Sequence, residues 1–141
     1  MAMNFTVMKL QLTHDATLTM LKAAVQTAEQ IGQPQCIVIV DASGEVLGEI
    51  RMLGAKFLSR KSALSKAQTA ASIGAPTTHI PEAVRPAIAA ATDGSVTGLP
   101  GGLPILMSGQ LVGGIGVGSG SGEQDIEVAR AALIAIGADV S

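Results

Sequence analysis

Apolar residues recur at helical spacing in three segments of the chain. The first begins at Thr13 or Asp15 and ends at Gly32, and the other two cover about 59–73 and 122–136. The defining positions are Leu18, Leu21, Val25 and Ala28 in the first, Leu64, Ala67, Ala70 and Ala71 in the second, and Ile126, Ala129, Leu133 and Ile136 in the third. Because intervals of three and four residues fall on one helical face, each segment predicts an amphipathic helix.

Shorter apolar runs predict β-strands. The predicted strands cover residues 4–12, 36–40, 45–51, 103–107 and 111–117. The first alternates only loosely and suits an edge strand, whereas the others form two hairpins that turn at Ser43-Gly44 and Ser108-Gly109. The pattern predicts the α+β class, with helices packed on a mainly antiparallel sheet of about five strands.

A long segment separates the second helix from the second hairpin. Gly74 and Pro76 end that helix, and a short helical stretch follows at 82–91, interrupted by Pro86. Excursions of the length of 74–98 often serve as lids or subunit contacts.

Glycine occupies every second position from Gly114 to Gly122. One face of this strand therefore lacks side chains, and a ligand, another helix or a second subunit is expected to approach it closely. The loop after the strand fits no dinucleotide-binding motif, and two acids in the next helical turn would repel a phosphate. Ser121 and Gln124 instead predict a capping box.

Composition narrows the class of protein. The chain has 141 residues, of which 48% are hydrophobic, 14% are charged and two are aromatic. With so few charged residues, part of the surface must be apolar, and we expect it to be buried between the subunits of a homo-oligomer. A net charge of −2 and few aromatic rings speak against nucleic-acid binding. The chain shows no signal peptide and no run of 18 apolar residues, so we expect a soluble cytoplasmic protein without membrane association.

Positive charge gathers in the middle of the sequence. Five of the nine basic residues are Arg51, Lys56, Arg60, Lys61 and Lys66, and no acid lies between Glu49 and Glu82. A solvated helix face explains such a run equally well. The functional interpretation is a docking place for the carboxylates of a small anionic ligand, with Arg51 and Lys66 as the best candidates.

Few residues offer catalytic or metal chemistry. His14 and His79 are the two histidines, and neither has a carboxylate or cysteine at ligand spacing, so a protein-only metal site is not expected. His14 is a candidate axial ligand for a cofactor iron, against the alternative of a capping or surface histidine. Cys36, the single cysteine, is expected to be a small buried hydrophobe.

Several motifs in a fixed order carry a family resemblance. They are Val40-Asp41-Ala42-Ser43-Gly44 at a strand turn, Arg51 followed by Gly54-Ala55, Lys66-Ala67-Gln68-Thr69-Ala70 on a helix, Gly101-Gly102-Leu103-Pro104-Ile105, and Gly113-Gly114-Ile115-Gly116-Val117 with Glu123-Gln124-Asp125. From about residue 12 to 138 the chain resembles the GlcG/HbpS family, which includes the carboxy-terminal domain of PduO-type cobalamin adenosyltransferases. We therefore expect residues 1–141 to form one domain of this kind.

The resemblance implies a profilin-like or PAS-like fold that assembles into tetramers to octamers. For some members it also implies binding of haem or a corrinoid. The chain departs from the family pattern at Gly118, where serine is common, and at Gln68. These departures concern the ligand more than the fold.

Taken together, these features predict a homo-oligomeric protein that binds a small ligand, haem or a related tetrapyrrole or corrinoid, and needs no other cofactor. The residues expected at the cofactor are His14, Arg51, Lys66, Gly101, Gly102, Gly114 and Gly116, with His14 axial to a haem iron. The alternative is an enzyme or accessory protein for a small hydroxy acid, using Lys66 or Glu123 as the base.

Overall fold

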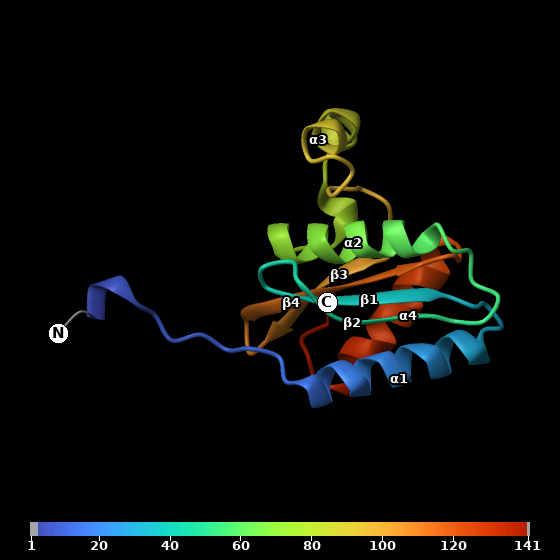
Figure 1. The fold of residues 1–141 in the computed structure, drawn as a ribbon, viewed down its shortest axis with the longest axis horizontal. Coiled ribbons are helices and arrows are strands. Elements are labelled where there is room, and N and C mark those ends of the chain that lie inside the picture. Colours follow the sequence, from blue (N-terminus) through green and yellow to red (C-terminus); the bar gives the residue numbers. More distant parts are fainter. Residues whose placement is uncertain (1–2, 141) are drawn as a thin grey trace.

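The computed structural model describes residues 3–140 and arranges them in three layers, with a four-stranded sheet between helices (Figure 1). The strands are β1 (Cys36–Asp41), β2 (Val46–Arg51), β3 (Gly102–Met107) and β4 (Gln110–Gly118), paired antiparallel in the order β2-β1-β4-β3. The helices are α1 (His14–Gln30), α2 (Ser59–Ile73), α3 (Arg85–Ala91) and α4 (Gly122–Ala135), and three short 3-10 helices cover Met3–Phe5, Thr77–His79 and Glu82–Val84. The predicted α+β class is confirmed.

The sheet is covered on both faces. Helix α2 packs on one face, and α1 and α4 pack on the other (Figure 1). Along β1, Ile37 and Ile39 belong to the core under α1 and α4, whereas Val38 and Val40 belong to the core under α2. This double burial explains why β1 is an unbroken apolar run rather than an alternating one.

The N-terminal segment differs from its prediction. Residues 4–12 form no strand, so the sheet has four strands and not about five. The first 3-10 helix stands apart from the body, and an extended stretch leads from it to α1 (Figure 1, blue); the exposures of Phe5, Val7 and Met8 are 86%, 86% and 100%. A strand needs a hydrogen-bonding neighbour, and the described chain supplies none to this segment.

Helix α1 begins where the sequence predicted, but its buried face is rotated. The hydroxyl of Thr13 accepts a hydrogen bond from the Ala16 backbone N–H at 3.1 Å and caps the helix. Of the four positions expected in the core, Leu18 is 62% exposed, Leu21 and Val25 are partly buried against the core, and Ala28 is buried. The buried positions are Thr17, Met20, Ala24 and Ala28, which also recur at helical spacing. Their mostly small side chains allow α1 to pack against α4.

The glycines of β4 face α2. A Cβ atom built on Gly116 would lie 1.9 Å from the carbonyl oxygen of Ala63, and one on Gly114 would lie 2.3 Å from that of Ala67. Both distances are far below a van der Waals contact, so only glycine fits beneath the helix. The predicted packed face of α2 is confirmed, since Ala67, Ala70 and Ala71 are buried. Of the three partners expected at the glycine face, another helix is the one found.

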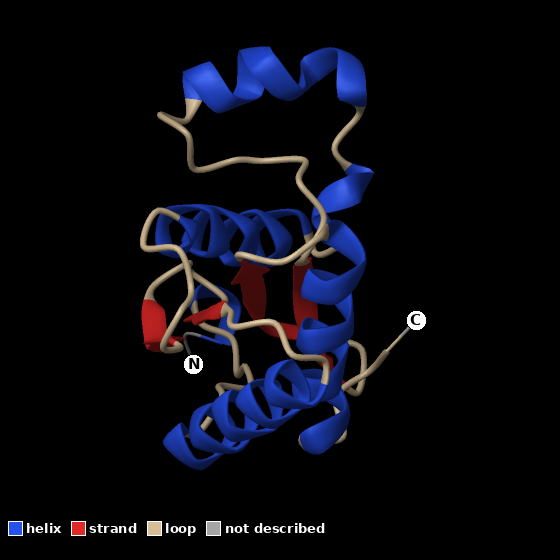
Figure 2. Cartoon of the chain, turned by 90° about the vertical axis from the view of Figure 1, so that its right-hand side faces the viewer, coloured by secondary structure: helices blue, strands red, loops and turns tan. Residues whose placement is uncertain are grey.

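Residues 74–98 form an arm that leaves the body and returns to it. Gly74 adopts φ +66° and ends α2, as predicted. Pro86 does not interrupt a helix, because it stands in the first turn of α3, where its missing N–H costs nothing. Helix α3 stands beyond α2 and has no buried residue (Figure 2). The return is fixed to α2, because Ser65 and Thr69 donate hydrogen bonds to the carbonyls of Gly94 at 2.8 Å and Ser95 at 3.1 Å.

Helix α4 begins at the predicted capping box. The backbone N–H of Gln124 donates to the Ser121 hydroxyl, and the Gln124 side chain accepts from the backbone N–H of Ser121. In the part of the chain that the structure describes, no helix is both long and apolar enough to cross a membrane.

Candidate functional site

A large hollow lies where the C-terminal end of α1 meets the end of β2. This Arg51 groove has a volume of about 600 Å³. Its apolar wall consists of Val25, Pro34, Ile50, Met52 and Leu53, and its charged groups belong to Arg51 and Glu29. A large apolar concavity with a few polar groups is the usual form of a small-molecule site.

Arg51 is the last residue of β2 and is exposed. It stands opposite Cys36 across the β1–β2 ladder. The nearest acid along its strand, Glu49, is paired with Arg60 at the start of α2. Among residues 3–140, Arg51 itself makes no ion pair or side-chain hydrogen bond, so its guanidinium is available to a ligand.

Cys36 is buried, as expected, and makes a weak hydrogen bond to the Lys56 carbonyl, with an Sγ–O distance of 3.6 Å. Burial raises the pKa of its thiol above the ordinary value, and the nearby Arg51 and Arg60 only partly oppose that shift. Because a thiol must ionise to attack or to bind a metal, Cys36 acts as a core residue.

Lys66 lies away from the groove, in the interior. Its side chain is 6% exposed, and Nζ donates to Asp125 Oδ2 at 2.9 Å and to the Val117 carbonyl at 2.8 Å. Asp125 Oδ1 also accepts the Gly120 backbone N–H at 3.1 Å. The pair therefore joins α2 to the start of α4, and both contacts of Lys66 Nζ are made inside the protein.

The glycines predicted at the cofactor pack around the same interior elements. A Cβ on Gly101 would lie 2.7 Å from Asp125 Cβ and 3.2 Å from Lys66 Nζ, and one on Gly102 would lie 2.5 Å from the Lys66 carbonyl oxygen. Gly114 and Gly116 lie under α2. The structure thus brings Lys66 and the glycines together as packing partners, and not around an open cavity.

His14 and the second proposed base lie elsewhere. His14 is exposed at the first turn of α1, where its Nε2 is 3.9 Å from Asp15 Oδ1. At 1.5 Å per residue, the rise of α1 places it about 17 Å from Val25 and about 23 Å from Glu29, two of the residues that line the groove. Glu123 is exposed in the first turn of α4, and His79 is exposed at the end of its 3-10 helix.

One buried polar residue was not found from the sequence. Gln35 is fully buried, and within the described residues neither its side-chain nitrogen nor its oxygen has a hydrogen-bond partner. Its amide lies beside Gly120, where a Cβ would come within 2.6 Å of Gln35 Nε2. Its backbone N–H donates to Met52 Sδ at 3.4 Å. The sequence feature that could have revealed its burial is its position directly before the apolar run 36–40.

No cluster of three or more potential metal ligands occurs among the described His, Cys, Asp and Glu residues.

Comparison with known proteins identifies relatives of the whole fold. Residues 12–134 match the model of a family described as haem degrading protein HbpS-like. The chain is 37% identical over 120 residues to the corrinoid adenosyltransferase PduO of Citrobacter freundii, an alignment that covers 82% of this chain and 36% of that protein. The chain thus spans about a third of that relative's length.

Two solved structures are similar over nearly their full length. A crystal structure of a PduOC–heme complex superposes with a TM-score of 0.86 at 31% identity, covering 92% of this chain and 98% of that one. A crystal structure of HbpS superposes with a TM-score of 0.82 at 34% identity, covering 93% and 94%.

Proposed function

The chain belongs to the HbpS-like family, and on that premise we propose that it is a homo-oligomeric protein that binds haem or a related tetrapyrrole in the Arg51 groove. The observation that carries this proposal is the combination of an apolar wall with an unpaired guanidinium at its edge. The heme complex of PduOC and the corrinoid chemistry named for PduO support the ligand class.

Different parts of the groove suit the macrocycle of such a ligand and its peripheral polar groups. A flat macrocycle buries its faces against apolar side chains, and a peripheral carboxylate accepts charge-assisted hydrogen bonds from a guanidinium. Glu29 at the same groove repels a carboxylate but accepts hydrogen bonds from the side-chain amides of a corrinoid. The charges that line the groove therefore bear on the choice between haem and corrinoid.

The residues that line the groove fit the macrocycle better than they fit its iron. No histidine is among them, and the thioether of Met52 already accepts the Gln35 N–H. Haem bound here would bring a redox-active iron, whereas this chain supplies apolar cover and one fixed positive charge. An axial bond from His14 requires the histidine of a second copy, because Val25, the nearest groove residue on its own helix, is about 17 Å away along α1.

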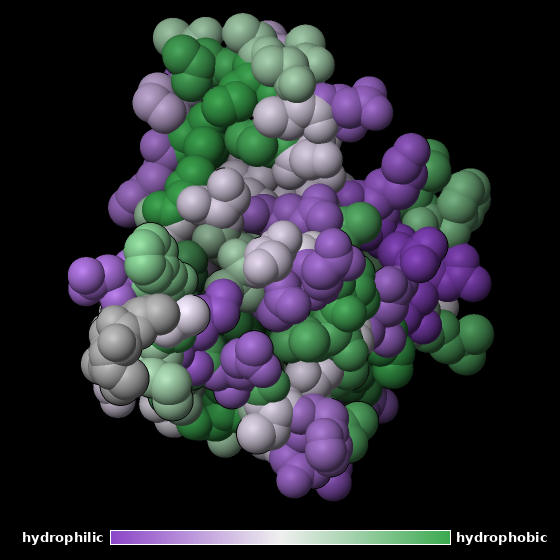
Figure 3. All heavy atoms as spheres, turned by 60° about the vertical axis from the view of Figure 1, so that its left-hand side comes forward, coloured by the Kyte–Doolittle hydropathy of each residue, from purple (hydrophilic) through white to green (hydrophobic). Residues whose placement is uncertain are grey.

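Exposed surface supports the oligomer. A compact monomer of 14.1 kDa exposes about 6,700 Å², whereas this chain exposes 7935 Å². The excess of about 1,200 Å² exceeds the ~800 Å² that one partner buries in a standard interface. Apolar residues gather beside polar ones on the arm formed by residues 74–98 (Figure 3, top), where Val84 is exposed, and the N-terminal segment adds Val7 and Met8.

A haemin titration followed by absorbance tests the proposal. Arg51→Gln is expected to weaken binding about fivefold, because it removes one partly solvated charge-assisted contact. Lys22→Gln, which removes another exposed charge, from α1, is the matched control and should change nothing. Glu29→Gln is expected to strengthen haemin binding. Equal affinities for wild type and Arg51→Gln would place the ligand elsewhere.

The role of His14 has its own readout. In His14→Ala the Soret band of the bound haemin is expected to shift, because the axial ligand changes. An unchanged spectrum would remove His14 from the site and leave the groove proposal intact.

A further inference from the structure

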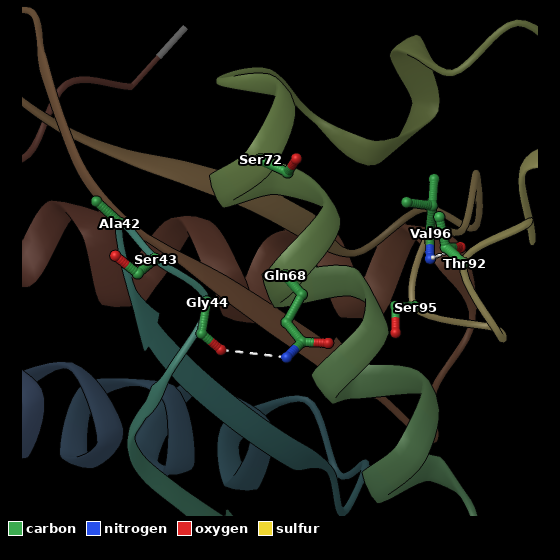
Figure 4. A pocket seen from close by; sticks show the side chains of 8 residues that line it. All are labelled: Ala42, Ser43, Gly44, Gln68, Ser72, Thr92, Ser95 and Val96. Atoms are coloured by element: carbon green, nitrogen blue, oxygen red, sulfur yellow. Dashed lines mark hydrogen bonds between the residues drawn. The ribbon is translucent and has the colours of Figure 1, made fainter.

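A second hollow lies on the other side of the molecule's middle layer, over the outer face of α2. It has a volume of about 310 Å³ and shares no lining residue with the Arg51 groove. In Figure 4 the β1–β2 turn at 42–44 forms one side, Gln68 and Ser72 project from α2, and residues 92–96 of the returning arm form the other side. We call it the serine hollow.

The polar side chains that line the serine hollow are neutral, and most of them make no hydrogen bond within the described part of the chain. Within the described residues, the hydroxyls of Ser43, Ser72 and Ser95 have no hydrogen-bond partner. Gln68 donates through Nε2 to the Gly44 carbonyl at 3.1 Å, which leaves its side-chain oxygen as an acceptor (Figure 4). No charged residue lines the hollow.

The walls are held in place by other hydrogen bonds. Thr92 donates through its hydroxyl to the Ile88 carbonyl at 2.7 Å and accepts the Val96 backbone N–H at 3.0 Å. Thr69 accepts the Thr97 backbone N–H at 3.0 Å while it holds the Ser95 carbonyl. Isolated surface serines are simply solvated, but here three of them line one concavity whose walls are held by hydrogen bonds, which lowers the entropy cost of binding.

The lining selects a chemical class. Each hydroxyl both donates and accepts, so a ligand with several hydroxyls can satisfy all of the free groups. A carboxylate would lose water without meeting a cation, and a flat apolar molecule would cover unpaired hydroxyls. The volume lies at the lower end of the range for ligand pockets. We propose that the serine hollow binds a small neutral polyol.

Saturation-transfer NMR with erythritol, compared with its carboxylate analogue erythronate, tests this on the full chain. Erythritol is expected to bind saturably in the millimolar range and more tightly than erythronate. Ser72→Ala should weaken erythritol about fivefold, the effect of one lost hydrogen bond, and Ser72→Leu should abolish binding by filling the hollow. Thr19→Ala, which removes an exposed hydroxyl from α1, should match wild type.

Three results would overturn the proposal: a response to erythritol that never saturates, tighter binding of erythronate, or unchanged binding in Ser72→Leu. Because Ser72 is exposed, its variants are expected to fold, and a thermal melt checks this. Haemin binding is expected to be the same in Ser72→Leu and wild type. Failure of this proposal therefore leaves the Arg51 groove untouched, and the reverse also holds.

Discussion

From the sequence, Lys66 could be either a ligand-binding cation or one half of a buried ion pair. A basic residue on a helix with no acid nearby in sequence predicts an anion site, but Asp125, 59 positions later, comes within 2.9 Å of its Nζ. Sequence spacing cannot reveal such a partner, because α2 and the start of α4 meet only after the sheet forms. Arg51, at the end of β2, belongs to the same basic run of the sequence, and unlike Lys66 it remains unpaired in the described chain.

The buried pair gives a prediction at this scale. Lys66→Met leaves the Asp125 carboxylate buried without its cation, so we expect unfolding free energy to fall by about 3–5 kcal/mol, measured by urea denaturation. The double variant Lys66→Met with Asp125→Leu should recover part of this loss, although the Gly120 N–H then loses its acceptor. If Lys66→Met kept wild-type stability and lost haemin binding instead, Lys66 would be a ligand-binding residue.

At the scale of elements, segments with a regular hydrophobic period were predicted correctly, whereas the loosely alternating segment 4–12 was not. Helix α2 has the predicted range, and both hairpins turn where expected, because helical period and turn chemistry are local properties. The strand predicted over residues 4–12 does not form. Alternation of apolar and polar residues describes the two faces of a strand and says nothing about whether another strand is available to pair with it. The glycines of β4 predicted a close approach, but the choice among helix, ligand and subunit depended on how α2 packs.

A graded series tests this packing. Alanine at Gly116, Gly114 and Gly118 would place its Cβ 1.9, 2.3 and 2.9 Å from carbonyl oxygens of α2 or its first residue. Backbone must move to relieve each contact, so destabilisation is expected to decrease in that order, from about 3 kcal/mol at Gly116. Urea denaturation measures it. Equal small losses, with weakened haemin binding, would instead indicate that these glycines face a ligand.

At the scale of the whole molecule, the candidate groove could not be predicted. It forms where the end of α1 meets the end of β2, two segments whose proximity depends on the packing of α1 beside the sheet edge. The sequence supplied Arg51 but not its apolar wall. The expected surplus of apolar surface was predictable from composition. Among the described residues, the structure places exposed large apolar side chains on the N-terminal segment, along 46–58 and, on the arm, at Val84.

That surplus leads to a prediction about assembly. Val84, on the arm, is 43% exposed, and a glutamate there would have to be desolvated in any interface that covers the arm. We expect wild type to sediment at the mass of a tetramer to octamer and Val84→Glu to shift toward smaller species. Gln26→Glu, which adds the same charge to an exposed position of α1, should sediment as wild type does. A wild-type protein at the monomer mass would show that the arm and the N-terminal segment remain in water, and a histidine from a second copy could then not complete the Arg51 groove.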